Sequence, residues 1–130
     1  MSDYKRMKAF DKMTKELKGY VGVGAFESAA LVHSANDAAM VKFENRDGSR
    51  ALAKDTSPSD RWLTEGLRQY AEWGLGKNYV WVVWDDDHTI SMKDDRNRKL
   101  YWYERSGTKW LCWTGEKEKD NQAILTFELE

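Results

Sequence analysis

The strongest strand pattern in the chain is Tyr79-Val80-Trp81-Val82-Val83-Trp84, which consists entirely of aromatic and β-branched residues. Such residues favour extended backbone, because their bulky side chains fit a pleated surface. Apolar side chains at successive positions face both sides of a sheet, so the run is typical of a central strand that is covered on both faces. The run is far shorter than the ~20 apolar residues that a membrane helix needs.

Four further strands are predicted after this run, separated by turn sequences rich in Asp, Asn, Ser and Gly. They cover residues 88–93, 99–104, 109–113 and 123–128. In the last of them, alternation places Leu125, Phe127 and Leu129 on one face. We therefore expect an antiparallel sheet of about five C-terminal strands, unusually rich in Trp and Tyr.

A first helix is predicted over residues 2–18. Its apolar residues recur at spacings of three and four, which places them on one face of a helix: Tyr4, Met7, Phe10, Met13 and Leu17. Ser2 is a suitable N-cap, and Gly19 is a suitable residue to end the helix.

A second helix is predicted to begin at Ser57 and Pro58, because serine caps helices and proline suits the first helical position. Its apolar face consists of Trp62, Leu63, Leu67, Tyr70 and Ala71, and Gly74 and Gly76 end it. Both helices are expected to pack on the sheet.

The region between the helices has a weaker pattern. Residues 27–32 suit a strand or a helix, and we favour a strand. Residues 40–44 and 49–53 are predicted to pair as a smaller hairpin, because Asp47-Gly48 supplies the positive φ angles of a tight turn. The predicted fold class is therefore α+β, with two helices on the aromatic sheet plus this N-terminal hairpin. No repeat or linker is visible, so residues 1–130 are predicted to form a single domain.

Composition narrows the class of protein. The chain has 130 residues, of which 41% are hydrophobic and 33% are charged, as expected for a globular domain. Its net charge of −1 favours neither nucleic acid nor an acidic membrane as partner. The N-terminus lacks the apolar core of a secretion signal. The single cysteine, Cys112, excludes an internal disulfide, so a reducing cytoplasm is the expected location.

The aromatic residues of the sheet are the first candidate site. Exposed aromatic side chains on a sheet can stack on bases or anchor a protein partner. We single out Trp81, Tyr101 and Tyr103 as candidate anchors for a protein partner. Core packing and cross-strand aromatic pairs are the alternative explanation for most of the set.

Two acidic turns are the second candidate site. Asp86 and Asp87 precede the predicted strand 88–93, and Asp94 and Asp95 follow it. The two clusters would lie about 20 Å apart at 3.3 Å per residue, too far to share one cation. We therefore predict no metal site. The four carboxylates suit contact with a partner protein that has a basic surface, and solvated turns are the alternative.

Four lysines would share one face of the first predicted helix: Lys5, Lys8, Lys12 and Lys15. Such a face could contact phosphates, which makes nucleic-acid or nucleotide binding an alternative function. The segment 19–24 holds three glycines but follows a predicted helix instead of opening one, so a phosphate-binding loop is not expected there.

The function expected from these observations is that of a small binding protein that occupies a partner protein's surface. Proteins that phages or mobile elements use to inhibit a host enzyme have this character, which is an analogy. A small enzyme with an unrecognised acid–base site that includes His88 is a further alternative. We expect no cofactor, assign no catalytic residue and foresee no membrane partner. The sequence leaves the oligomeric state open.

Overall fold

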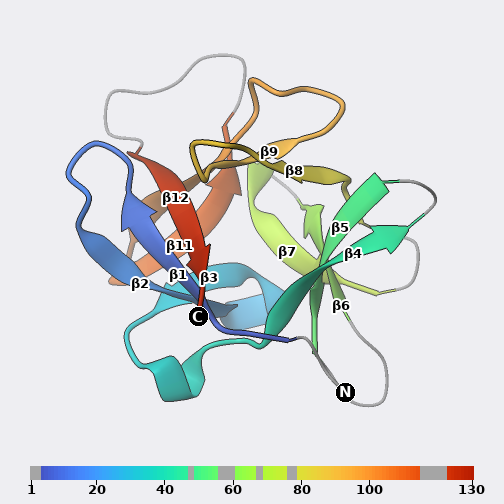
Figure 1. Cartoon of the computed structure of the whole chain (residues 1–130). Helices are drawn as coiled ribbons and strands as arrows, with labels where there is room; N and C mark the ends of the chain where they lie inside the picture. Colours follow the sequence, from blue (N-terminus) through green and yellow to red (C-terminus); the bar gives the residue numbers. More distant parts are fainter. Residues whose placement is uncertain (1–3, 47–48, 56–60, 67–68, 76–78, 115–122) are drawn as a thin grey trace.

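In the described part of the chain, almost all regular secondary structure is β-strand (Figure 1). The computed structural model describes residues 4–46, 49–55, 61–66, 69–75, 79–114 and 123–130. In these ranges helical structure is limited to short 3-10 turns, among them Ala25–Glu27 and Ala35–Asp37. No helix in this part of the chain is long and apolar enough to cross a membrane.

The strands follow one another through short connections. They are β1 (Met7–Asp11), β2 (Leu17–Val23), β3 (Ala29–Val32), β4 (Val41–Arg46), β5 (Ser49–Lys54), β6 (Arg61–Glu65), β7 (Ala71–Gly74), β8 (Val82–Trp84), β9 (Ile90–Met92), β10 (Leu100–Arg105), β11 (Thr108–Trp113) and β12 (Ala123–Leu129).

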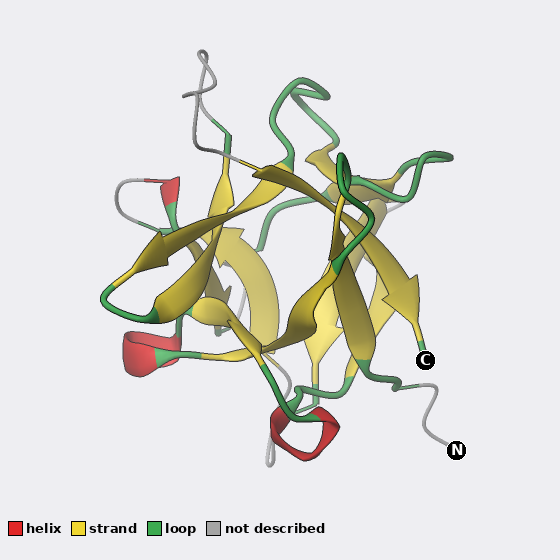
Figure 2. Ribbon diagram, turned by 90° about the vertical axis from the view of Figure 1, so that its left-hand side faces the viewer, coloured by secondary structure: helices red, strands yellow, loops and turns green. Residues whose placement is uncertain are grey.

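Six of these strands close a barrel in the order β1-β12-β10-β11-β3-β2. The barrel lies on the left in Figure 1, and this side faces the viewer in Figure 2. The first and last strands pair with each other in antiparallel register, with Ala9 opposite Phe127. Strands β4 to β7 form a four-stranded sheet in chain order, and β8 and β9 form a two-stranded sheet. All of these pairings are antiparallel. Because β1 pairs with β12, the six-stranded sheet is closed and has no free edge.

The same unit of four strands occurs three times along the chain. Strands β1, β5 and β9 begin at residues 7, 49 and 90, and β4, β8 and β12 begin at residues 41, 82 and 123. The second and third strands of each unit form a hairpin: β2 with β3, β6 with β7, and β10 with β11. The last strand of each unit pairs with the first strand of the next, and β12 closes the cycle onto β1. Three such units around a common axis are the architecture known as a β-trefoil.

Two tryptophans show this threefold relation in detail. The indole N–H of Trp73 in β7 donates a hydrogen bond to the carbonyl of Gly22 in β2, at 3.1 Å. Trp113 occupies the matching position in β11, and its indole N–H donates to the carbonyl of Thr64 in β6, at 3.3 Å. In both cases the third strand of a unit is joined to the second strand of the preceding unit. The third strand of the first unit, β3, has no tryptophan.

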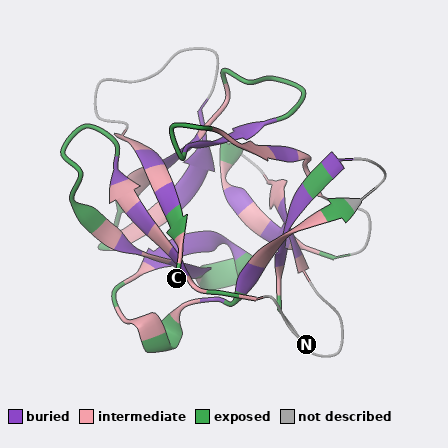
Figure 3. Ribbon diagram, viewed as in Figure 1, coloured by how far each residue is buried: buried purple, intermediate pink, exposed green. Residues whose placement is uncertain are grey.

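The core draws buried residues from all three units (Figure 3), and buried positions alternate along β1, β7 and the middle of β12. Its largest fully buried side chains include Trp73, Trp113, Phe127 and Met7. Burying an aromatic side chain of this size removes roughly 150–250 Å² from water, which is why a chain with seven tryptophans can close such a core.

The predicted α+β class is wrong, and the first predicted helix is a pair of strands. Met7 and Ala9 are both fully buried, at alternate positions of β1. Met13 and Leu17, which the helical pattern placed in the core, are 88% and 50% exposed. Spacings of three and four among bulky residues fitted a helix, but antiparallel pairing of β1 with β12 and β2 buries a different set of side chains.

The second predicted helix is also wrong. Its described part consists of β6 and β7, which pair with Leu63 opposite Trp73. Trp62 and Leu63 are both buried because the two faces of β6 contact different clusters: Trp62 packs with Ala51 and Ala53, and Leu63 lies in the main core. Ser57, Pro58, Leu67 and Gly76, which the helix prediction used, lie outside the described residues.

The strands predicted after residue 79 are present, but they do not form one sheet. The run 79–84 contributes only Val82–Trp84 to a strand, which pairs with β9 alone. Strands β10, β11 and β12 belong to the barrel with β1, β2 and β3. In β12, Leu125 and Phe127 are fully buried on one face, as predicted. The expected N-terminal hairpin is the β4–β5 pair.

Candidate functional site

The most developed candidate site is an apolar pocket where the three hairpins end. It has a volume of about 340 Å³. Each hairpin contributes to it: Ala25, Phe26 and Ser28 from the β2–β3 connection, Tyr70 and Glu72 from the β6–β7 connection and β7, and Arg105, Ser106 and Trp110 from the β10–β11 hairpin. We call this the tip pocket. Each unit supplies one aromatic residue, namely Phe26, Tyr70 and Trp110.

Phe26 projects from the rim of the tip pocket with 98% of its surface exposed. Its backbone is left-handed, with φ of 57°, and the next residue, Glu27, has φ of 59°. A left-handed backbone costs a non-glycine residue roughly 1–2 kcal/mol. Strained residues of this kind concentrate at functional sites, where the surrounding structure holds them.

Local hydrogen bonds hold the loop that carries Phe26. The Gly24 N–H donates to the Ser28 carbonyl at 2.8 Å, and the Ser28 hydroxyl donates to the Ala25 carbonyl at 2.7 Å. Glu27 pairs with Arg61 of β6 at 3.6 Å, which connects the loop to the second unit. Phe26 is therefore an exposed apolar side chain on an ordered loop.

The walls of the tip pocket are two aromatic rings at a steep angle. The ring centroids of Tyr70 and Trp110 lie 6.1 Å apart, and their planes are inclined by 69°. The Trp110 indole N–H donates to the Arg105 carbonyl at 3.4 Å. The other side of this ring packs on Gly24, where an added Cβ would lie only 3.0 Å from its Cζ3 atom. Glycine at this position therefore leaves the space that Trp110 occupies.

The charged residues at the tip pocket are Glu72 and Arg105. Glu72 also lines an adjoining hollow of about 550 Å³ together with Phe26, Glu27 and Glu65. Glu27 pairs with Arg61, and Glu65 pairs with Arg98. Within the described ranges, no cation lies within ion-pair distance of the Glu72 carboxylate.

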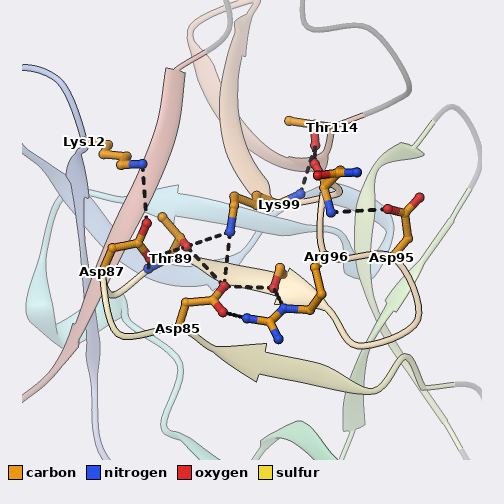
Figure 4. Close-up of polar contacts among 10 residues, drawn as sticks. Lys12, Asp85, Asp87, Thr89, Asp95, Arg96, Lys99 and Thr114 are labelled. Carbon is orange, nitrogen blue, oxygen red and sulfur yellow. Dashed lines mark hydrogen bonds and ion pairs between the residues drawn. The ribbon is translucent and has the colours of Figure 1, made fainter.

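The acidic turn 85–87, which the sequence suggested as a partner surface, is part of an internal polar network (Figure 4). The Asp85 carboxylate is only 10% exposed and accepts hydrogen bonds from Ser91 at 2.9 Å and Lys99 at 3.1 Å, and it also pairs with Arg96. The Thr89 hydroxyl donates to Asp87 at 2.6 Å. We call the set Asp85, Asp87, Thr89, Ser91, Arg96 and Lys99 the polar network.

Hydrogen bonding changes the acidity of this network. The pKa of Asp87 falls from 3.8 to about 2, first because the Thr89 hydroxyl donates to its carboxylate. Lys12 adds to this effect from 3.4 Å. The pKa of Lys99 is lowered by burial, which removes water from its ammonium group. Asp87 is therefore occupied by intramolecular contacts that a partner would have to replace.

The other predicted acidic contacts are scattered. Asp86 is exposed, and Asp95 accepts a hydrogen bond from the backbone N–H of Asn97 at 3.2 Å. Asp94 lines a separate hollow of about 320 Å³ with Trp81. The structure thus brings together Asp94 and Trp81 from the predicted partner-binding set, whereas Asp86 and Asp87 lie at the other end of β9.

The predicted aromatic anchors differ in exposure. Tyr101 is only 6% exposed, and burial raises the pKa of its hydroxyl to about 12. Trp81 is half-buried, with the Lys93 ammonium 5.4 Å from its ring centroid. Tyr103 is half-buried and lies opposite Trp110 in the β10–β11 register, which places it beside a wall of the tip pocket.

The four lysines do not share a helical face. Lys8 in β1 pairs with Glu130 at 3.4 Å, and Lys12 pairs with Asp87. Lys5 precedes β1, and Lys15 lies in the exposed β1–β2 turn. Within the described residues, no group of three His, Cys, Asp or Glu side chains is placed to hold a metal ion.

Sequence reasoning missed Phe26 and Trp110, and it assigned Tyr70 to a helix. The residues of the tip pocket lie in segments about 40 residues apart that resemble one another only in their place in each unit. One signal was available: Phe26 stands among small and polar neighbours, after the segment 19–24 with its three glycines and before the predicted strand 27–32.

No family model matches the sequence, and no curated protein matches it. Solved structures do match the backbone. The lysenin pore is similar over 100% of this chain and 47% of its own chain, with 13% identity and a TM-score of 0.60. Soybean trypsin inhibitor is similar over 100% of this chain and 94% of its own, with 11% identity and a TM-score of 0.52. This chain therefore spans about half the length of the lysenin pore chain, and at these identities the likenesses show its fold alone.

Proposed function

We propose that this protein is a binding protein that holds a protein partner on the surface around the tip pocket. The observation that carries this proposal is Phe26, a 98% exposed aromatic side chain on a hydrogen-bonded loop beside an apolar pocket. Leaving such a side chain in water forgoes roughly 1.5–3 kcal/mol of burial free energy, and its backbone adds strain. Both costs are offset when Phe26 is buried in a partner.

A protein fits this surface better than a small molecule does. A small ligand in the tip pocket would cover only the side of Phe26 that lines it, although the ring is 98% exposed. A protein partner can receive Phe26 and insert a side chain of its own into the pocket. Such paired anchors at the centre of an interface carry most of the binding energy in many complexes, and aromatic residues are frequent among them.

The fold is compatible with this role. Soybean trypsin inhibitor has a backbone similar to that of this chain, and by its name it acts on a protein. This likeness supports the proposal as a fold-level analogy. Inhibition of a host enzyme by a phage-type protein is a narrower version that stays a prediction. Nucleic-acid binding also stays a prediction, although the helix on which it was based is absent. The cytoplasm is the proposed compartment, because the single cysteine has no disulfide partner.

The test compares capture of proteins from the native cell extract by three forms of the full chain: wild type, Phe26→Ala and Met13→Ala. Met13 is the matched control, because it is 88% exposed and lies in the β1–β2 turn, outside the tip pocket. We expect at least one protein to be captured by wild type and Met13→Ala but not by Phe26→Ala.

The affinity for the captured protein is then measured by calorimetry. We expect Phe26→Ala to raise Kd about 30-fold, as for a central aromatic anchor worth about 2 kcal/mol. Met13→Ala should change Kd less than about twofold. Equal capture by wild type and Phe26→Ala would overturn the proposal.

A further inference from the structure

We propose that the tip pocket binds an alkylammonium group of the partner, that is, a lysine side chain or its methylated forms. This inference rests on the proposed function, since it names the partner side chain that enters the pocket beside Phe26. The first argument is the shape of the walls. Tyr70 and Trp110 form an edge-to-face pair, with centroids 6.1 Å apart and planes inclined by 69°, and both residues line the pocket, so a bound group meets the ring surfaces that the pair leaves open.

The faces of aromatic rings carry partial negative charge and attract cations within about 6 Å of the ring centroid. Sites that recognise methylated ammonium groups commonly combine several aromatic walls in this way. Here one wall comes from each unit: Tyr70 and Trp110 form the angle, and Phe26 stands at the rim. An alkyl chain that ends in an ammonium group matches both the apolar lining and the π-faces.

Charge supplies the second argument. Glu72 lies in the wall of the tip pocket, and no described residue offsets its charge. Its carboxylate lies over Gly66, where even a single added Cβ would overlap it. The same carboxylate faces the adjoining hollow, which Glu27 and Glu65 also line. A cation that enters the tip pocket beside the two aromatic rings therefore gains a carboxylate partner in addition to the rings.

Arg105 opposes this preference, because its positive charge also lines the pocket. It is exposed at the hairpin end, so solvent screens its repulsion. Neutralising Glu72 and neutralising Arg105 should therefore change the affinity for a cation in opposite directions. Removing the charge of Glu72 should weaken the binding of a cation, and removing the charge of Arg105 should strengthen it.

The experiment measures binding of three amino-acid amides to the full chain by NMR, followed through the indole N–H resonance of Trp110. The resonance is assigned with Trp110→Phe. The probes are the Nα-acetyl amides of trimethyl-lysine, lysine and norleucine. Norleucine keeps the alkyl chain but lacks the ammonium group. We expect trimethyl-lysine to bind most tightly, then lysine, with norleucine at least tenfold weaker than trimethyl-lysine.

The variants locate the source of this selectivity. Glu72→Gln is expected to lower the affinity for trimethyl-lysine about tenfold, and Arg105→Gln to raise it two- to threefold. Gly66→Ala keeps both charges and the aromatic rings but displaces the Glu72 carboxylate, so it should resemble Glu72→Gln. Near-ultraviolet circular dichroism checks that each variant keeps the wild-type packing.

Two results would overturn the inference: norleucine binding as tightly as trimethyl-lysine, or no shift of the Trp110 resonance with any probe. Neither result would affect the proposed function, which depends on capture of a protein through Phe26. If Phe26→Ala captures the same proteins as wild type while trimethyl-lysine still binds the pocket, the proposed function fails and the inference of alkylammonium binding stands.

Discussion

The tip pocket collects residues from three hairpins that are distant in sequence, whereas the polar network lies within residues 85–99, and the two sites use their residues in opposite ways. In the polar network, the Asp85 and Asp87 carboxylates accept hydrogen bonds from Thr89, Ser91 and Lys99. In the tip pocket, Phe26 is exposed and Tyr70 and Trp110 line an open hollow. Groups that are paired inside the protein stabilise the fold, whereas groups that remain unpaired at the surface are available to a partner.

This difference corrects the sequence-based choice of partner surface. Acidic residues in turns resemble a docking patch because their charge is visible in the sequence, but their hydrogen bonds are not. The aromatic residues of the tip pocket were less conspicuous, because seven tryptophans and six tyrosines occur in the chain and most of them belong to the core or its margins. The comparison predicts that variants of the network change stability and variants of the pocket change binding.

The largest expected effect is that of Asp85→Ala on stability. Removing this nearly buried carboxylate leaves the Ser91 hydroxyl without its acceptor and takes the ion-pair partner from Lys99 and Arg96, and breaking such a pair costs about 3 kcal/mol. Urea unfolding followed by tryptophan fluorescence measures the loss, with the exposed neighbour Asp86→Ala as control. A loss below about 1 kcal/mol would show that the network does not hold β8, β9 and β10 together.

A smaller loss of stability is expected when Asp87 becomes protonated at low pH. The pKa of Asp87 is about 2 in the folded protein, and its ordinary value, taken for the unfolded chain, is 3.8. The contribution of Asp87 to stability is therefore complete above about pH 4 and is lost as the pH falls towards 2. The side chain is 46% exposed, so screening keeps this contribution below about 1 kcal/mol.

Urea titrations between pH 5 and 2 test this contribution. Asp87→Asn should flatten the decline in unfolding free energy over that window. Lys12→Met should flatten it less, because the Thr89 hydroxyl is the larger cause of the lowered pKa. An unchanged decline in Asp87→Asn would assign the acid sensitivity to other carboxylates.

Phe26→Ala should leave the stability of the isolated protein within about 0.5 kcal/mol of wild type, because the ring is 98% exposed. Thermal or urea unfolding of the variant measures this directly. A loss above 1 kcal/mol would mean that the ring packs on its own protein, and the contrast between pocket and network would then fail.

The smallest expected effect is on the reactivity of the Cys112 thiol, which tests whether the tip pocket opens into the core. A single antiparallel β-bridge pairs Cys112 of β11 with Tyr70, a lining residue of the pocket, and Cys112 is only 2% exposed. Burial raises the pKa of this thiol to about 12, and the thiol is the only one in the chain. We expect no reaction with a thiol reagent such as dithionitrobenzoate in the native state and full reaction in urea. Rapid native labelling would show that the pocket opens into the core.

The sequence predicted individual strands better than their assembly. The segments 99–104, 109–113 and 123–128 lie in strands, because β-branched and aromatic residues favour extended backbone locally. The segment 2–18 was assigned to a helix because Met7, Phe10 and Met13 fit a helical face as well as they fit alternate faces of strands. Only pairing with β12 distinguishes the two possibilities, and β12 is more than 100 residues away in sequence.

The residue types alone were enough to predict aromatic-rich strands, the absence of an internal disulfide and the alternation of the last strand. The repetition of the described strands as three units, and the meeting of Phe26, Tyr70 and Trp110 at one pocket, could be found only in the folded chain. The physical reason is that strand pairing depends on partners far along the chain, and that hydrogen bonds, which decide which charges are paired, form only after the strands are in register.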